Sequence, residues 1–199
     1  SLAPSEKLVA LMSRFGFRSL LGELGVAEAP APVAVRKSAG DAAWKIAYRE
    51  TPAKAWLAAA RKAKAVAVAV AESGQPDLLH EAGPVIGLAL PDGRAAVFAE
   101  GELSANKDAL GRLLADAGVA KLGHDLKSAR RILRRFGLEL AGPREDTMLA
   151  AYCLNPSRSR FDLEAVLAAY GGPPPGEQAS RAAAIWPLAE RLGGELRDG

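Results

Sequence analysis

The 199-residue chain has a single cysteine, Cys153, so it cannot form an internal disulfide framework. Long apolar runs are also missing, because the longest, residues 65–71, falls well short of the roughly 18–20 residues that a membrane span needs. We therefore expect a cytoplasmic protein with no membrane partner. Cys153 has apolar neighbours in the sequence and is expected to be a buried, inert thiol.

The common motifs for phosphate binding and nucleophilic catalysis are absent as well. The sequence contains no GxxxxGK[ST] loop, no GxGxxG turn, no pair of cysteines and no GxSxG elbow. Its two histidines, His80 and His124, lie far apart and lack a zinc-binding context. We expect His80 in an exposed loop and His124 at the end of a strand in a structural role.

Charges of the two signs nearly balance, with a formal net charge of +3, and aromatic residues make up only 6% of the chain. This composition permits contact with nucleic acid but offers few rings for stacking bases. The positive charge gathers on one predicted helix, over residues 126–136, whose opposite side is apolar. The five cations of this face are Lys127, Arg130, Arg131, Arg134 and Arg135. They follow a phosphate backbone, form a solvated outer face, or pair with acids of a neighbouring segment.

The order of the predicted elements indicates an α/β fold with a mixed β-sheet flanked by helices. Strands are predicted over residues 44–49, 66–70, 84–90, 94–99 and 120–123. Helices are predicted over residues 5–25, 52–62, 104–117, 126–136, 146–154, 162–170 and 177–192. The apolar run containing Val66, Val68 and Val70 predicts a central strand covered on both faces. A proline-containing linker divides the chain into a helical segment, 1–30, and a larger domain, 31–199.

A long ordered string of residues resembles the exonuclease region of bacterial DNA polymerase I (family A). It includes KLGHDLK at 121–127, DTMLAAYCLNP at 146–156 and FDLEAVL at 161–167. Residues 11–21 are similar to the segment where that family's 5′ nuclease region ends. The resemblance implies a ribonuclease H-like fold of the DnaQ exonuclease class, in a fragment from the middle of a larger DNA-directed DNA polymerase that acts in replication and repair. It also implies packing on the polymerase region, DNA as the partner of the parent polymerase, and Mg²⁺ in that polymerase region.

Active exonucleases of this class use carboxylates to hold two divalent metal ions that drive hydrolysis. The family pattern is Asp-x-Glu at the end of the first strand, an Asp on a later helix, and Tyr-x-x-x-Asp on the last helix. The resemblance places Val70 and Glu72 on the first pair, Ala129 on the helix Asp, and Gln178 and Ala182 on the last two positions. Three of the four carboxylates are replaced, and the remaining Glu72 is expected to be solvated, so we expect no metal site.

The first hypothesis is therefore a vestigial, inactive 3′–5′ exonuclease-like domain that serves as a structural spacer and a weak DNA-contacting module. The alternative is an active two-metal proofreading exonuclease that uses other acids near the expected places. Those acids are Asp77, Glu81, Asp125, Glu177 and Asp198. None of them has the required strand spacing or helix face. A third hypothesis is a free-standing nucleic-acid-binding protein with this fold.

Overall fold

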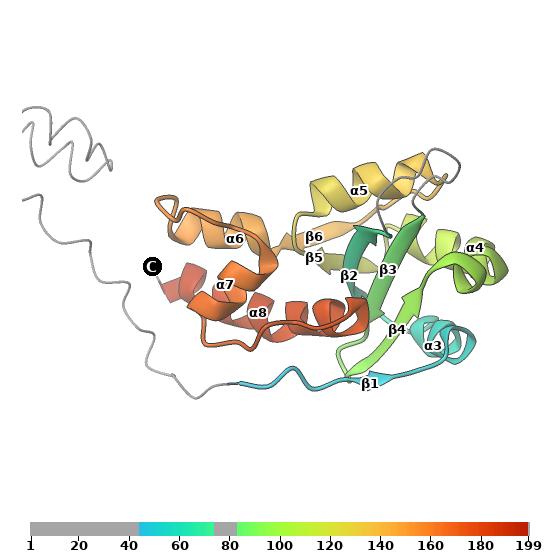
Figure 1. The fold of residues 1–199 in the computed structure, drawn as a ribbon, viewed down its shortest axis with the longest axis horizontal. Helices are drawn as coiled ribbons and strands as arrows, with labels where there is room; N and C mark the ends of the chain where they lie inside the picture. The colour runs from blue at the N-terminus through green and yellow to red at the C-terminus, as the bar shows by residue number, and fades with distance from the viewer. Residues whose placement is uncertain (1–43, 74–82, 199) are drawn as a thin grey trace, which may run out of the picture. The chain divides into compact units, whose positions relative to one another are not determined.

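The computed structural model describes residues 44–73 and 83–198, which belong to one compact unit (Figure 1). The strands are β1 (Arg49–Glu50), β2 (Ala65–Glu72), β3 (Pro84–Ala89), β4 (Arg94–Phe98), β5 (Ala120–Gly123) and β6 (Pro143–Asp146). The helices are α3 (Ala53–Ala60), α4 (Glu100–Ala115), α5 (Leu126–Arg135), α6 (Thr147–Leu154), α7 (Leu163–Ala169) and α8 (Gln178–Asp198). The segment expected over residues 1–30 and the side chains Asp77, His80 and Glu81 lie outside the described residues.

The strands form one six-stranded sheet in the order β1-β4-β3-β2-β5-β6. Strand β2 pairs antiparallel with β3 and parallel with β5, while β3 and β4 form an antiparallel hairpin. The predicted mixed sheet flanked by helices is therefore confirmed, and so is the central position of the valine-rich strand. Across residues 44–73 and 83–198, no helix is long and apolar enough to cross a membrane.

Alternate residues of β2 point to opposite faces of the sheet, and different helices cover these two faces. Val66 and Val68 are fully buried in a core cluster that includes side chains of α3, α4 and α5. Ala67 and Ala69 instead pack in a cluster with α8 residues such as Ala182. The second face is therefore an interface between small side chains.

Helix α8 lies very close to the sheet at its first residue. A Cβ atom added to Gly87 of β3 would lie 2.1 Å from the backbone oxygen of Gln178, so only glycine fits there. Further along the helix, Trp186 Nε1 donates a hydrogen bond of 3.1 Å to the Ala89 carbonyl of β3. These contacts fix the start of α8, which carries two of the expected catalytic positions.

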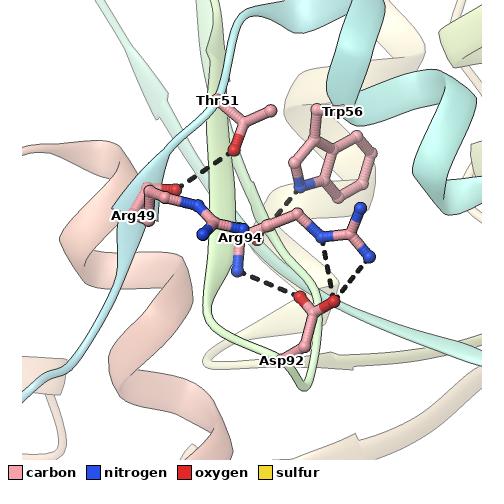
Figure 2. Close-up of polar contacts among 5 residues, drawn as sticks. All are labelled: Arg49, Thr51, Trp56, Asp92 and Arg94. Atoms are coloured by element: carbon pink, nitrogen blue, oxygen red, sulfur yellow. Dashed lines mark hydrogen bonds and ion pairs between the residues drawn. The ribbon is translucent and has the colours of Figure 1, made fainter.

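The β3–β4 turn contacts the edge strand β1 and helix α3 (Figure 2). Gly93 has a φ of +84°, which suits a residue without a side chain, and Asp92 Oδ1 accepts a 3.1 Å hydrogen bond from the Arg94 backbone N–H. Trp56 Nε1 of α3 donates to the Arg94 carbonyl at 3.1 Å, and the Arg49 backbone N–H donates to the Gly93 carbonyl at 2.8 Å. Figure 2 shows that the Asp92 carboxylate also forms an ion pair with the Arg94 guanidinium.

Three expectations about strands and helix starts are wrong. Of the strand predicted over residues 44–49, only Arg49 is a strand residue, in β1. Trp44 instead packs on the C-terminal helices, and its Nε1 donates to the Tyr170 carbonyl at 3.0 Å. Helix α4 begins at Glu100 rather than at Ser104, since the chain turns into the helix directly after β4. Strand β6 was not predicted, because it consists of a proline and three charged residues that are exposed or only partly buried.

Two further expectations are corrected near the C-terminal end of the described region. Cys153 is exposed, because α6 turns Thr147 and Ala151 inward and leaves the cysteine on its outer side. Helix α8 continues beyond residue 192 to Asp198.

Candidate functional site

A pocket of about 390 Å³ lies at the carboxyl ends of the parallel strands β2 and β5. In α/β sheets this edge is the usual place for ligands. The pocket is lined by Val68, Ala69, Val70, His124, Asp125, Met148, Phe161, Asp162, Leu163, Glu164, Arg181 and Ile185. The position expected for the first catalytic carboxylate, Val70, is therefore part of this pocket, which we call the strand-end pocket.

Three of the four positions assigned to carboxylates hold apolar side chains in packed surroundings. Val70 is half-buried against the core beneath α5, and Ala129 is buried on α5 itself. Ala182 is fully buried between α8 and the sheet, in the same cluster as Ala67 and Ala69. Each of these positions contributes methyl groups to the packing and no oxygen atom to the pocket.

The remaining carboxylate, Glu72, forms an ion pair with Arg135 of α5. It was expected to be simply solvated, but the end of β2 lies near the end of α5 and supplies this cation. The Glu72 side chain is still 37% exposed. At the expected tyrosine position, Gln178 has a buried Oε1 atom without a hydrogen-bond partner among the described residues.

Two of the pocket's own carboxylates cap helices. Asp125 precedes α5 and accepts a 3.1 Å hydrogen bond from the Ser128 backbone N–H. Asp162 precedes α7 and accepts a 3.0 Å hydrogen bond from the Ala165 backbone N–H. That bond, with help from Arg160, lowers the pKa of Asp162 below its usual value. Both side chains thus stabilise helix starts by satisfying backbone donors.

The third carboxylate of the pocket, Glu164, forms an ion pair with Arg181 of α8. The hydrogen bond from Arg181 lowers the pKa of Glu164, although partial burial opposes the shift. Within residues 44–73 and 83–198, no three His, Cys, Asp or Glu side chains are grouped so that they could hold a metal ion. Of the other acids considered from the sequence, Glu177 and Asp198 are exposed near the two ends of α8.

His124 follows β5 directly and ties it to two other segments. Its Nε2 atom lies 2.6 Å from the Phe161 carbonyl, and its Nδ1 atom lies 2.8 Å from the Thr147 hydroxyl. Because the Phe161 carbonyl can only accept, Nε2 carries a proton. Burial lowers the pKa of His124, against the opposing effects of the Phe161 carbonyl and of Asp146. The arrangement agrees with the structural role expected for this histidine.

Asp146 is a central side chain that sequence reasoning missed. Its carboxylate accepts hydrogen bonds from the backbone N–H groups of Asp125 at 3.1 Å and Leu126 at 2.7 Å. It also accepts from Met148 at 2.9 Å and Leu149 at 3.4 Å, at the start of α6. One carboxylate therefore joins the starts of α5 and α6. The sequence signal was an Asp directly before the apolar run of α6, which is an N-cap pattern.

The cationic face of α5 is partly neutralised. Arg130 and Arg134 both donate to Glu139, at distances between 2.6 and 3.3 Å. Arg135 pairs with Glu72, as described above. Lys127 and Arg131 have no ion-pair partner in the part of the chain that the structure describes. Pairing with acids of neighbouring segments, one of the explanations considered for this face, therefore applies to three of its five cations.

A groove of about 620 Å³ runs between α5 and the edge strand β6. Its cations are Lys127, Arg130, Arg131, Arg134 and Arg144, its acids are Glu145 and Asp146, and its apolar lining is formed by Leu126, Leu140, Pro143 and Leu149. We call it the cationic groove. It is separate from the strand-end pocket, since the two share no lining residue.

Comparison with known proteins finds similarity to DNA polymerase I. Residues 77–173 match the family model "DNA polymerase I, ribonuclease H-like domain". DNA polymerase I of Geobacillus stearothermophilus is 31% identical over 216 aligned residues, covering 96% of this chain and 23% of that protein. DNA polymerase I of Bacillus subtilis is 32% identical over 95 residues, covering 48% of this chain and 11% of that protein. The chain thus spans less than a quarter of these relatives.

Solved structures show a similarity of the same kind. The POL domain of Pol1 from M. smegmatis, in complex with DNA primer-template and dNTP, superposes with a TM-score of 0.61 at 26% identity and covers 76% of this chain and 27% of that chain. Escherichia coli RNase D superposes with a TM-score of 0.50 at 18% identity over 76% of this chain and 45% of that chain, and this likeness shows the fold alone. The predicted ribonuclease H-like fold is confirmed, and the matches support a DNA polymerase I exonuclease-like domain.

Proposed function

We propose that this chain is the exonuclease-like domain of a DNA polymerase I and that it has lost 3′–5′ exonuclease activity. Its role is then that of a spacer that packs on the polymerase region and contacts DNA weakly, while the parent enzyme synthesises DNA with Mg²⁺ in its polymerase region. The observation that carries the proposal is the state of the expected ligands: Val70, Ala129 and Ala182 are packed apolar side chains, and Glu72 is paired with Arg135.

The residues present do not fit a two-metal centre. Such a centre needs hard oxygen ligands that bridge two ions about 3.5–4 Å apart. Of the four assigned carboxylate positions only Glu72 offers oxygen, and the Arg135 guanidinium already neutralises it. A single change such as Val70→Asp would place one charge against the core beneath α5, which costs several kcal/mol or raises the pKa of the new carboxyl.

The carboxylates of the strand-end pocket are the ones that an active enzyme would have to use instead. Asp125 and Asp162 hold backbone donors at helix starts, and Glu164 holds Arg181. Recruiting them to a metal would give up these contacts. The active proofreading exonuclease therefore remains the second candidate, and the assay below distinguishes it from the first.

The link to a polymerase region is supported by the relatives rather than by the pocket. The M. smegmatis Pol1 structure that this chain resembles is a polymerase domain in complex with primer-template DNA. A spacer domain needs a stable fold and a surface that contacts the polymerase region, and it needs no catalytic activity of its own. Its contact with DNA would come from the partly neutralised cations of α5, so it should be weak and should fall steeply with salt.

The test is an exonuclease assay on the 199-residue chain with a single-stranded oligonucleotide labelled at its 3′ end, in Mg²⁺ and separately in Mn²⁺. We expect no release of mononucleotides above a no-protein control. The matched variants are Glu72→Ala, which removes the last assigned ligand, and Asp125→Asn, which alters the strand-end pocket. Metal-dependent release that either variant abolishes would overturn the proposal in favour of an active exonuclease, and the responsible variant would identify the ligand set.

A further inference from the structure

A carboxylate paired with two arginines of the cationic groove occupies a position suited to a phosphate. Glu139, which follows α5, receives N–H groups from two guanidinium groups one helical turn apart (Figure 1 shows α5 and β6, which form the groove). Its Oε1 atom accepts from Arg130 Nε at 3.1 Å and Nη2 at 2.6 Å, and also from Arg134 Nη2 at 3.3 Å. Its Oε2 atom accepts from Arg134 Nε at 3.0 Å. Four directed donors on one anion form the same kind of fork that arginines present to a phosphodiester.

Glu139 is ionised at neutral pH, because the hydrogen bonds from Arg134 and Arg130 lower its pKa. Its carboxylate therefore competes with any external anion for these two arginines. The pairs are largely exposed, with arginine side chains that are 48% and 57% accessible. Exposed pairs of this kind are weak and exchange readily with other partners. A polyanion that releases counterions on binding can displace the carboxylate.

We propose that the cationic groove binds the phosphate backbone of a single nucleic acid strand and that Glu139 acts as an internal competitor that keeps this binding weak. The inference rests on the proposed DNA-contacting role and deepens it. Lys127 and Arg131 supply the first contacts, and Arg130 and Arg134 join when a phosphate replaces Glu139. Arg144 of β6 lines the same groove.

The lining of the groove favours a single strand over a duplex or an acidic peptide. Leu149 is 57% exposed and shares the groove lining with Pro143, which is also exposed, while Leu126 and Leu140 of the same lining are buried. The unstacked bases of a single strand can cover this apolar surface, whereas a duplex keeps its bases inside. The doubly forked donors of Arg130 and Arg134 suit the oxygens of a phosphodiester along a continuous backbone. Carboxylates of a peptide would offer the same charge without the regular spacing.

The decisive variant is Glu139→Gln, which keeps the shape of the side chain and removes its charge. Its matched control is Glu50→Gln, which changes the net charge equally on β1, at the opposite edge of the sheet. Binding of the 199-residue chain to a fluorescent oligothymidine of about 12 nucleotides is measured by anisotropy between about 50 and 200 mM salt. We expect Glu139→Gln to bind about three- to tenfold more tightly than wild type at the lowest salt.

The salt dependence supplies a second readout. Releasing two arginines should steepen the slope of log K against log salt by up to about 1.4, at about 0.7 for each phosphate neutralised on a single strand. Adding Arg130→Ala and Arg134→Ala to Glu139→Gln should remove the gain. Glu139→Ala serves as an independent variant, and thermal melting checks that each protein is folded.

The outcomes separate the two proposals. If wild type binds at low salt but Glu139→Gln binds no better than Glu50→Gln, the competitor role is overturned while the DNA contact stands. If neither wild type nor Glu139→Gln binds at the lowest salt, the DNA-contacting part of the proposed function fails, and this inference fails with it. Equal competition by duplex DNA or by polyglutamate would overturn the assignment of a single strand as the occupant.

Discussion

Gly87 offers a direct test of how closely α8 lies on the sheet. In Gly87→Ala the new Cβ would lie 2.1 Å from the Gln178 oxygen and 2.5 Å from its carbonyl carbon, both of them backbone atoms that cannot rotate away. Reaching ordinary contact requires a shift of roughly 1 Å at the start of α8, in an interior packed like a crystal. We expect a loss of about 2–3 kcal/mol in the free energy of unfolding, because overpacking of this kind costs about 1–3 kcal/mol and α8 is held along its length.

The assay is urea unfolding followed by circular dichroism and tryptophan fluorescence, with Trp186 reporting on the contact between α8 and β3. The loss corresponds to a fall of roughly 4–12 °C in Tm for a domain of this size. The matched control is Gly194→Ala in the same helix, where a Cβ meets nothing within 4 Å, so we expect a gain of about 0.5–1 kcal/mol. If Gly87→Ala proved as stable as wild type, α8 would not press on β3, and the placement of Gln178 and Ala182 would be wrong.

Two further predictions concern the polar ties around the strand-end pocket. Asp146→Ala removes the acceptor of four backbone N–H groups and should lower the free energy of unfolding in urea by about 2–4 kcal/mol. The control Asp108→Ala, on the exposed side of α4, should change it by less than about 0.5 kcal/mol. Equal effects of the two variants would contradict the bridging role of Asp146. Burial lowers the pKa of His124 in the folded chain, whereas in the unfolded chain this histidine binds a proton near pH 6.5. The free energy of unfolding should therefore fall as the pH drops from 7.5 to about 5.5. His124→Gln should flatten this dependence, and an unchanged slope would show that another group is responsible.

The sequence predicted best the elements whose pattern is local. The unbroken apolar run that contains Val66, Val68 and Val70 identified the central strand, and the apolar stripe of α5 identified that helix. Prediction from the sequence failed where a contact with a residue far along the chain determines the local structure. Trp44 lies in an alternating stretch typical of a strand, yet its hydrogen bond to the Tyr170 carbonyl holds it against helices far along the chain.

The candidate site shows the same division. The assignment of Val70, Ala129 and Ala182 to carboxylate positions comes from the register of a resemblance, and it stays a prediction. The partners of the charged groups were not readable from the order of residues. Five cations on one helix predicted a basic face, but only the folded chain places Glu139 between Arg130 and Arg134. The reach of Asp146 to the backbone before α5 likewise depends on the pairing of β5 with β6.

The small side chains beneath α8 also have a consequence for synthesis on the ribosome. About 80 residues separate the end of β4 from the start of α8, and at roughly 5–20 residues per second they take about 4–16 seconds to make. During that interval one face of the β2–β3–β4 sheet has no helix to cover it. Because that face consists largely of alanines such as Ala67, Ala69 and Ala89, it exposes less apolar area than leucines or valines would. Until α8 is synthesised, the nascent chain therefore exposes little apolar surface to which chaperones or neighbouring chains could bind.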